Sequence, residues 1–230
     1  MTTATRHIPD QIHESPEVVI QNDVLKGVKD HTLGPQGSRV LIVDPGEYRA
    51  SSSIGMAVAL EEAGIYPEDF DHIIVNSSGA FAGVGFAQGR MGEILKYCEK
   101  TSPRKTLRFR DIQKRSILKV EKLLSGMLLG EEIQDEQEWY KRVVIRDHQA
   151  KPVIHVVTTT VGENPEPRYI RSDEVSPEEF QKALAATLTI PRWSEPVRTI
   201  NGIPGIDGYF SDPVMYDYAR TLGASHVVKL

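Results

Sequence analysis

Apolar residues in the first part of the chain form short unbroken runs that alternate with longer mixed stretches. The runs at residues 39–44 and 71–76 are rich in Val and Ile, which is typical of strands buried on both faces of a parallel sheet. The stretch at 52–63 stops at Gly64, the stretch at 78–88 is mostly small and apolar, and both predict helices. The order strand, helix, strand, helix is typical of an α/β fold.

The second half of the chain carries further helix and strand patterns. Ser176 followed by Pro177 and Glu179 is a helix-capping pattern and predicts a helix over residues 176–186. Helices are also predicted at 110–129, 132–140 and 213–222, strands at 152–160, 168–171 and 226–230, and a broken edge element at 197–206. We expect a three-layer α/β sandwich with a mainly parallel central sheet.

The polar residues 1–37, with their prolines and glycines, indicate an N-terminal arm before one α/β domain over residues 38–230. No apolar stretch approaches the ~20 residues of a membrane span, and the first residues lack the apolar core of a signal peptide. The net charge of −5 argues against nucleic-acid binding. Cys98 is the only cysteine, which excludes an intrachain disulfide, so we expect a cytoplasmic protein.

A serine stands where the second predicted strand meets the second predicted helix. In a nucleophile elbow, a serine in such a turn has a strained backbone, and small neighbours relieve the crowding. Ser77 occupies this position and Gly79 supplies one small neighbour, whereas Val75 stands where the other is expected. The start of the helix also directs backbone N–H groups toward the group under attack. The plain alternative is a serine that only caps the helix.

Two other segments carry candidate chemistry. Asp207 and Gly208 form a turn signal shortly before the predicted helix at 213–222. Residues 45–50, directly after the first predicted strand, form a loop whose backbone N–H groups are suited to an oxyanion or a phosphate. Each signal is common when it stands alone.

Taken together, the three segments resemble the patatin-like phospholipase family. Its members carry a glycine-rich loop with an arginine, a Gly-x-Ser-x-Gly elbow and a distant Asp-Gly motif. In this chain Arg49 matches the loop arginine, Ser77 and Gly79 match the elbow, and Asp207 and Gly208 match the last motif. Further matches lie at residues 184–193 and 222–225.

The resemblance implies a patatin-like fold and a serine acyl hydrolase with a Ser–Asp dyad that needs no histidine and no cofactor. Ser77 is then the nucleophile that attacks a lipid ester, and Asp207 the general base. Backbone N–H groups near Gly46 and Glu47 hold the oxyanion, and Arg49 shapes the loop or stabilises charge. The implied partner is a lipid or acyl-ester substrate, with peripheral contact to a membrane.

Departures from the family pattern leave a second function open. Pro45 has no N–H group, Glu47 brings a carboxylate to the oxyanion loop, and Val75 replaces the first small residue of the elbow. Tyr209 replaces a glycine of the last motif. The alternative is therefore a catalytically impaired patatin-like scaffold that binds a lipid or a protein partner.

Other residues suggest further alternatives. Ser77, Asp207 and His226 follow the serine, acid, histidine order of a hydrolase triad, although His226 falls inside a predicted strand. The basic segment 104–119 suits either an anionic membrane surface or a solvated helix face. The histidines lack the spacing of metal ligands, so no metal is expected, and the glycines at 83–85 lie too late in a helix for a dinucleotide site.

Overall fold

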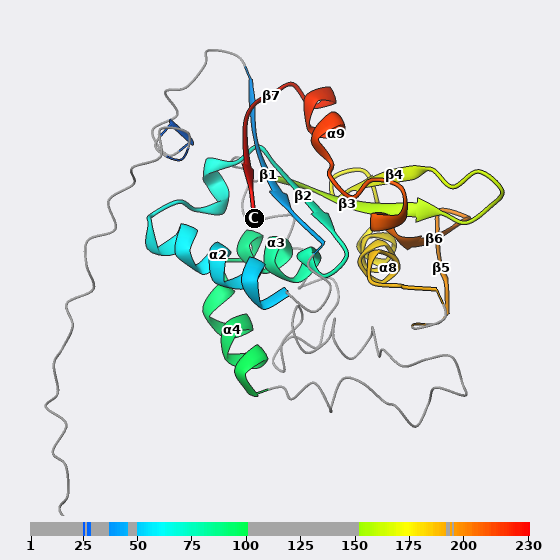
Figure 1. Cartoon of the computed structure of the whole chain (residues 1–230), viewed down its shortest axis with the longest axis horizontal. Coiled ribbons are helices and arrows are strands. Elements are labelled where there is room, and N and C mark those ends of the chain that lie inside the picture. The colour runs from blue at the N-terminus through cyan, green and yellow to red at the C-terminus, as the bar shows by residue number, and fades with distance from the viewer. Residues whose placement is uncertain are drawn as a thin grey trace, which may run out of the picture.

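The structure, a computed structural model, describes residues 25, 27–28, 37–45, 50–100, 152–191, 194 and 196–230. Seven strands form one sheet (Figure 1): β1 (Ser38–Val43), β2 (His72–Asn76), β3 (Val153–Thr160), β4 (Pro167–Arg171), β5 (Arg198–Ile200), β6 (Ile203–Asp207) and β7 (Ala224–Lys229). Hydrogen-bonded neighbours follow the path β5-β6-β3-β2-β1-β7, and β4 also pairs with β3. The pairs among β7, β1, β2 and β3 are parallel, whereas β4, β5 and β6 join by antiparallel pairs.

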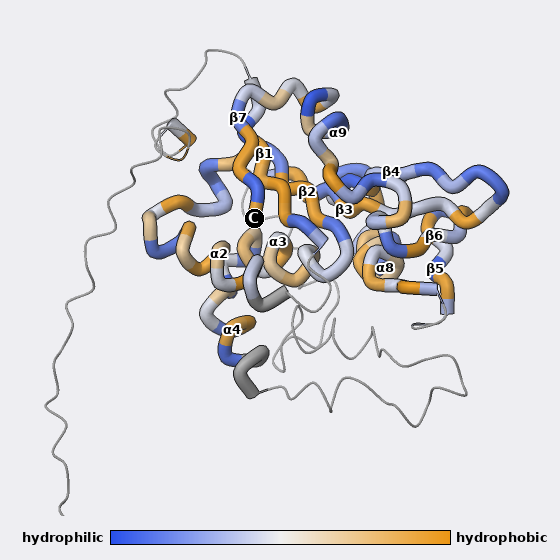
Figure 2. The backbone as a smooth tube through the Cα atoms, viewed as in Figure 1, coloured by the Kyte–Doolittle hydropathy of each residue, from blue (hydrophilic) through white to orange (hydrophobic). Residues whose placement is uncertain are grey.

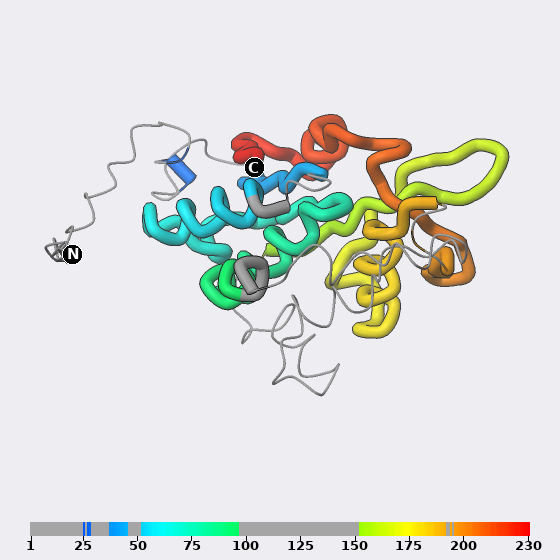
Figure 3. Tube along the Cα trace, turned by 60° about the horizontal axis from the view of Figure 1, so that its bottom comes forward, coloured from blue at the N-terminus to red at the C-terminus, as the bar shows by residue number. Residues whose placement is uncertain are grey.

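Helices cover both faces of this sheet. In the described ranges, the α-helices are α2 (Ala50–Glu62), α3 (Gly79–Ala87), α4 (Met91–Lys100), α8 (Pro177–Thr187) and α9 (Tyr216–Thr221), and the 3-10 helices are η2 (Pro67–Asp69) and η5 (Gly208–Phe210). Figure 3 shows α4 in green and α8 in yellow on one side of the strands, with α9 in red on the other. The predicted α/β sandwich around a mainly parallel sheet is therefore confirmed, with antiparallel pairs added at one end.

Alternate residues of the central strands enter two separate cores. Leu41, Ile73 and Val156 pack with residues of α2, α3, α4 and α8, whereas Ile42 and Val157 pack with Met215 and Ala219 near α9. Both faces of the central strands are thus buried, and so these strands appear in the sequence as unbroken apolar runs. Figure 2 shows them in orange, while the β3–β4 turn is largely blue.

Most predicted elements agree with the structure to within a few residues. The predictions at 39–44, 52–63, 71–76 and 78–88 correspond to β1, α2, β2 and α3, and those at 152–160, 168–171 and 176–186 to β3, β4 and α8. The predicted helices at 110–129 and 132–140, and most of the predicted arm, lie outside the described residues.

Three elements in the last part of the chain differ from their predictions. The single edge element predicted at 197–206 is a hairpin of β5 and β6, whose turn places Asn201 at a φ of 48° and Gly202 at 78°. The helix predicted at 213–222 begins only at Tyr216, because Met215 has a left-handed backbone and donates its N–H to Asp212 Oδ1. The strand predicted from residue 226 begins two residues earlier, as β7.

The register of β3 brings two distant strand ends together. β2 runs parallel to β3 and places its last residue, Asn76, opposite Val157. β6 runs antiparallel and places its last residue, Asp207, opposite Thr158. Since β4 pairs with the other edge of β3 at both positions, β2 and β6 share one edge and meet there by their carboxyl ends.

Candidate active site

Ser77 lies in the tight turn between β2 and α3. Its φ of 52° is left-handed, which is rare for a residue with a side chain and carries backbone strain. The residue is 7% exposed, and its backbone N–H donates to Thr187 Oγ1 at 2.8 Å. Ser77 therefore stands at a strained, buried strand-to-helix turn.

Glycines let the elbow sit against the strands. A Cβ on Gly79 would lie 2.5 Å from the carbonyl oxygens of both Val43 and Asp44, so only glycine allows α3 to start this close to the end of β1. A Cβ on Gly83 would lie 2.3 Å from Val75 Cγ1. The bulk of Val75, unexpected for the family, is therefore accommodated by the space that Gly83 leaves in α3.

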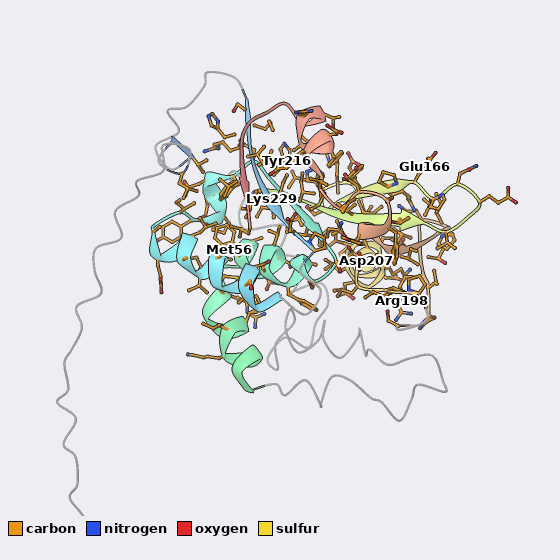
Figure 4. The ribbon with its side chains drawn as sticks, viewed as in Figure 1. Met56, Glu166, Arg198, Asp207, Tyr216 and Lys229 are labelled. Carbon is orange, nitrogen blue, oxygen red and sulfur yellow. The ribbon has the colours of Figure 1, made fainter. Side chains whose placement is uncertain are left out.

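The carboxylate of Asp207 meets the hydroxyl of Ser77. Ser77 Oγ donates to Asp207 Oδ2 at 2.6 Å, across 130 positions of sequence, and Asp207 is only 3% exposed. The other carboxylate oxygen, Oδ1, accepts the backbone N–H of Tyr209 at 2.9 Å. Figure 4 labels Asp207 among the side chains around it. Both carboxylate oxygens are thus occupied, which orients the group toward Ser77.

The backbone of Asp207 is held as firmly as its side chain. Its N–H donates to the carbonyl of Thr189 at 3.0 Å, and its carbonyl accepts the hydroxyl of Thr159 at 2.8 Å. A Cβ on Gly208 would lie 2.6 Å from the carbonyl oxygen of Val157, so this glycine permits the turn after Asp207 to pass close to β3. The position of Asp207 therefore depends on contacts to β3 and to the segment after α8.

A short hydrogen bond between a hydroxyl and a carboxylate is strong, and burial strengthens it because little water competes. The arrangement allows Asp207 to accept the Ser77 proton when Ser77 Oγ attacks an electrophile. α3 begins two residues after Ser77, so its first N–H groups lie at the same turn and favour negative charge there.

Residues 46–49 of the predicted oxyanion loop lie outside the described residues. Gly46, Glu47 and Arg49 belong to this group, so their roles stay predictions. The basic segment 104–119 lies outside the described residues as well.

The structure does not bring His226 to Ser77. His226 lies in β7 and pairs in register with Arg39, near the start of β1, while Ser77 follows the carboxyl end of β2. Its Nδ1 contacts Ser225 Oγ at 2.8 Å. Ser77 Oγ reaches Asp207 directly, with no histidine between them.

The sequence does not predict several contacts that threonine and asparagine side chains make at the elbow. Thr187 and Thr159 each bind one member of the Ser77–Asp207 pair, and Asn76 Nδ2 donates to the carbonyl of Asp212. Nothing in their local sequence distinguishes these residues from other buried polar residues of a strand or a helix end.

A second polar cluster lies on the α9 side of the sheet. His155 contacts His72 at 3.0 Å and the hydroxyl of Tyr218 at 2.9 Å. Burial, together with the positive charge of His72, lowers the pKa of His155 to about 3. Tyr169 stacks on Tyr218 and donates its hydroxyl to Asp212 at 2.6 Å. Burial also lowers the pKa of His72, so a positive charge is disfavoured on both histidines.

The described residues form neither a metal-binding cluster nor a membrane-spanning helix. Among the described residues, no three His, Cys, Asp or Glu side chains lie close enough to hold a metal ion. In that part of the chain, too, each helix is too short or too polar to cross a bilayer.

Comparisons with known proteins agree with the observed fold. The model of a family described as patatin-like phospholipase matches residues 46–220. The crystal structure of VipD from Legionella pneumophila has a similar fold, with a TM-score of 0.56 and 15% identity over 86% of this chain. The matched region spans only 50% of VipD, and at this identity the likeness concerns the fold alone. A comparison with curated proteins found no match. Since the family model covers more than half of the sequence, the chain belongs to the patatin-like phospholipase family.

Proposed function

We propose that the chain is a serine acyl hydrolase that cleaves carboxylic esters of acyl lipids, with Ser77 as nucleophile and Asp207 as general base. Family membership supports lipid hydrolase activity in general terms. The finer proposal rests on one observation, the 2.6 Å hydrogen bond between the buried Ser77 Oγ and Asp207 Oδ2 at a left-handed elbow.

In the proposed reaction, Ser77 Oγ attacks the ester carbonyl carbon while its proton passes to Asp207. The tetrahedral oxyanion is stabilised by backbone N–H groups at the start of α3 and near Gly46 and Glu47, with Arg49 shaping that loop. The intermediate expels the alcohol, which takes the proton from Asp207, and an acyl-enzyme remains. Asp207 then removes a proton from water, the hydroxide releases the fatty acid, and the proton returns to Ser77.

The proposed site of action is the surface of a membrane or lipid aggregate, since acyl lipids are largely insoluble. Tyr209 and Phe210, directly after the Asp207–Gly208 turn, are 52% and 56% exposed, and their rings are in edge contact. Aromatic side chains are favoured at membrane–water interfaces. This exposed pair lies next to the base and supports lipid contact there.

The second candidate function is the catalytically impaired scaffold. It is favoured by two residues of the oxyanion loop, because Pro45 offers no N–H and Glu47 adds a negative charge beside a developing oxyanion. Such a protein would keep the lipid site and lose the reaction.

A fluorophosphonate probe tests the proposal on the full chain. The nucleophile attacks phosphorus, an O–P bond forms and fluoride leaves, so only an activated serine is labelled. Peptide mapping is expected to find the label on Ser77, with none on Ser77→Ala. Asp207→Asn is expected to slow labelling by about 100-fold or more. The matched control is Ser78→Ala, at a neighbouring serine of similar burial, which is expected to label normally.

Two outcomes would contradict the proposal. Labelling on Ser78 would show that the nucleophile is the neighbouring serine. A folded wild-type chain that stays unlabelled, but binds acyl-lipid vesicles, would favour the impaired scaffold.

A further inference from the structure

The backbone N–H of Ser77 is bound by a side chain from another part of the fold. Thr187 Oγ1, at the last residue of α8, accepts this N–H at 2.8 Å across 110 positions of sequence. Thr187 is fully buried. No water therefore reaches the hydroxyl to compete with the contact, and its loss would leave a buried N–H without an acceptor.

The same hydroxyl continues into a chain of hydrogen bonds. It donates to Asn76 Oδ1 at 3.4 Å, a long contact, and Asn76 Nδ2 donates to the carbonyl of Asp212 at 3.1 Å. Asp212 lies in the segment that follows Asp207. These hydrogen bonds therefore connect the turn at Ser77 to the segment that follows Asp207. This connection is separate from the hydrogen bond between Ser77 Oγ and Asp207 Oδ2.

The left-handed backbone of Ser77 needs such support. A residue with a side chain keeps a φ near 52° only where surrounding contacts hold it, because the conformation is strained. The direction of the Ser77 N–H depends on this φ, and Thr187 binds that N–H. If φ relaxes, Ser77 Oγ turns away from Asp207 Oδ2.

We propose that Thr187 is a positioning residue for the nucleophile. Its hydroxyl oxygen, held in turn by Asn76, keeps the backbone of Ser77 in the left-handed conformation that directs Oγ at Asp207. Thr187 itself touches neither the reacting atoms nor the proton that moves. The inference rests on the proposed function, since it assigns a role within the same dyad.

The test compares three variants of the full chain. Thr187→Val removes the hydroxyl and keeps the shape, whereas Thr187→Ser keeps the hydroxyl. The matched control is Thr158→Val, the same change at another fully buried threonine, whose hydroxyl has no hydrogen-bond partner among the described residues. Each variant is assayed for the fluorophosphonate labelling rate per labelled site, and for kcat and KM on a water-soluble ester.

Thr187→Val is expected to lower the labelling rate and kcat by about 10- to 100-fold, the effect of a misplacement of up to about 1 Å. KM should stay nearly constant, because no group that contacts the substrate has changed. Thr187→Ser and Thr158→Val should keep rates close to the wild type. A merely structural role would reduce the fraction of labelled protein and the melting temperature, but not the rate at each labelled site.

The outcomes separate the inference from the proposed function. A labelled wild type together with an equally fast Thr187→Val overturns the inference alone, and so does an equal loss in Thr158→Val. An unlabelled wild type overturns both. If Thr187→Val does not fold, Thr187→Cys replaces it: sulfur is a weak acceptor, so an intermediate rate supports the inference and a wild-type rate overturns it.

Discussion

Substitution of Gly79 by alanine tests how tightly the elbow is packed against the sheet. The new Cβ would lie 2.5 Å from the carbonyl oxygens of Val43 and Asp44, and real contacts of this kind do not fall below 3.0 Å. Both obstacles are backbone atoms at the buried end of β1, which its pairing with β2 and β7 holds in place. The start of α3 must therefore retreat by about half an ångström, and Ser77 moves with it.

Overpacking of this kind costs about 1–3 kcal/mol of unfolding free energy, which urea denaturation measures. Because displacements of about 1 Å reduce rates by roughly 100-fold, Gly79→Ala should slow labelling of Ser77 by about tenfold or more. The control is Gly55→Ala in α2, where the new Cβ meets nothing within 4 Å. Gly55→Ala should raise the free energy of unfolding by at most about 1 kcal/mol and leave the labelling rate unchanged. A Gly79→Ala protein with wild-type stability and labelling rate would refute the reasoning.

Two further expectations concern the buried histidine and the exposed aromatic pair. Burial lowers the pKa of His155 to about 3, whereas a histidine in the unfolded chain has a pKa of about 6.5. At pH values below 6.5 the unfolded chain therefore binds more protons than the folded chain. The free energy of unfolding should therefore fall as pH drops from 6.5 toward 3, by up to about 1.4 kcal/mol per pH unit, and less steeply in His155→Gln. Replacing Tyr209 and Phe210 with serine should lower turnover of phosphatidylcholine vesicles by about tenfold but spare a soluble ester, whereas Tyr66→Ser, at a similar exposure of 53%, should spare both.

Specific results would contradict these two expectations. Equal pH profiles for the wild type and His155→Gln would show that His155 titrates alike in the folded and unfolded chains. Equal losses on vesicles and on the soluble ester would assign Tyr209 and Phe210 to the reaction site and not to a lipid-contacting surface.

The fold could be predicted wherever burial leaves a simple pattern. β1 and β2 are buried on both faces, so their residues form unbroken apolar runs, and the cap at Ser176 marks the start of α8. The sequence predicts one broken element where the structure has the β5–β6 hairpin, although Asn201 and Gly202 form a recognised turn signal. Pro204 and Gly205 obscure the alternation expected of a strand, so the two halves did not appear as separate strands.

The sequence predicts only those candidate site residues that stand at turns with a local sequence signal. Ser77 and Asp207 each stand at a turn with its own sequence signal, before Gly79 and Gly208 respectively. The contact of Thr187 with Ser77 depends on how α8 packs against the sheet. The two residues are 110 positions apart in the sequence, and hydrophobic periodicity does not predict contacts between such distant residues. Supporting residues of this kind therefore require the structure.

The meeting of β2 and β6 on β3 explains how Ser77 and Asp207 come into contact over this sheet. Parallel neighbours would place successive strand ends about 4.8 Å apart, side by side, with their turns leaving in the same direction. Here β6 runs antiparallel, so the turns after Asn76 and Asp207 leave from adjacent positions of one edge and approach each other. The backbone register of β3 with β2 and β6 therefore sets the distance between Ser77 Oγ and Asp207 Oδ2. In the proposed dyad, the nucleophile and the base are therefore in direct contact.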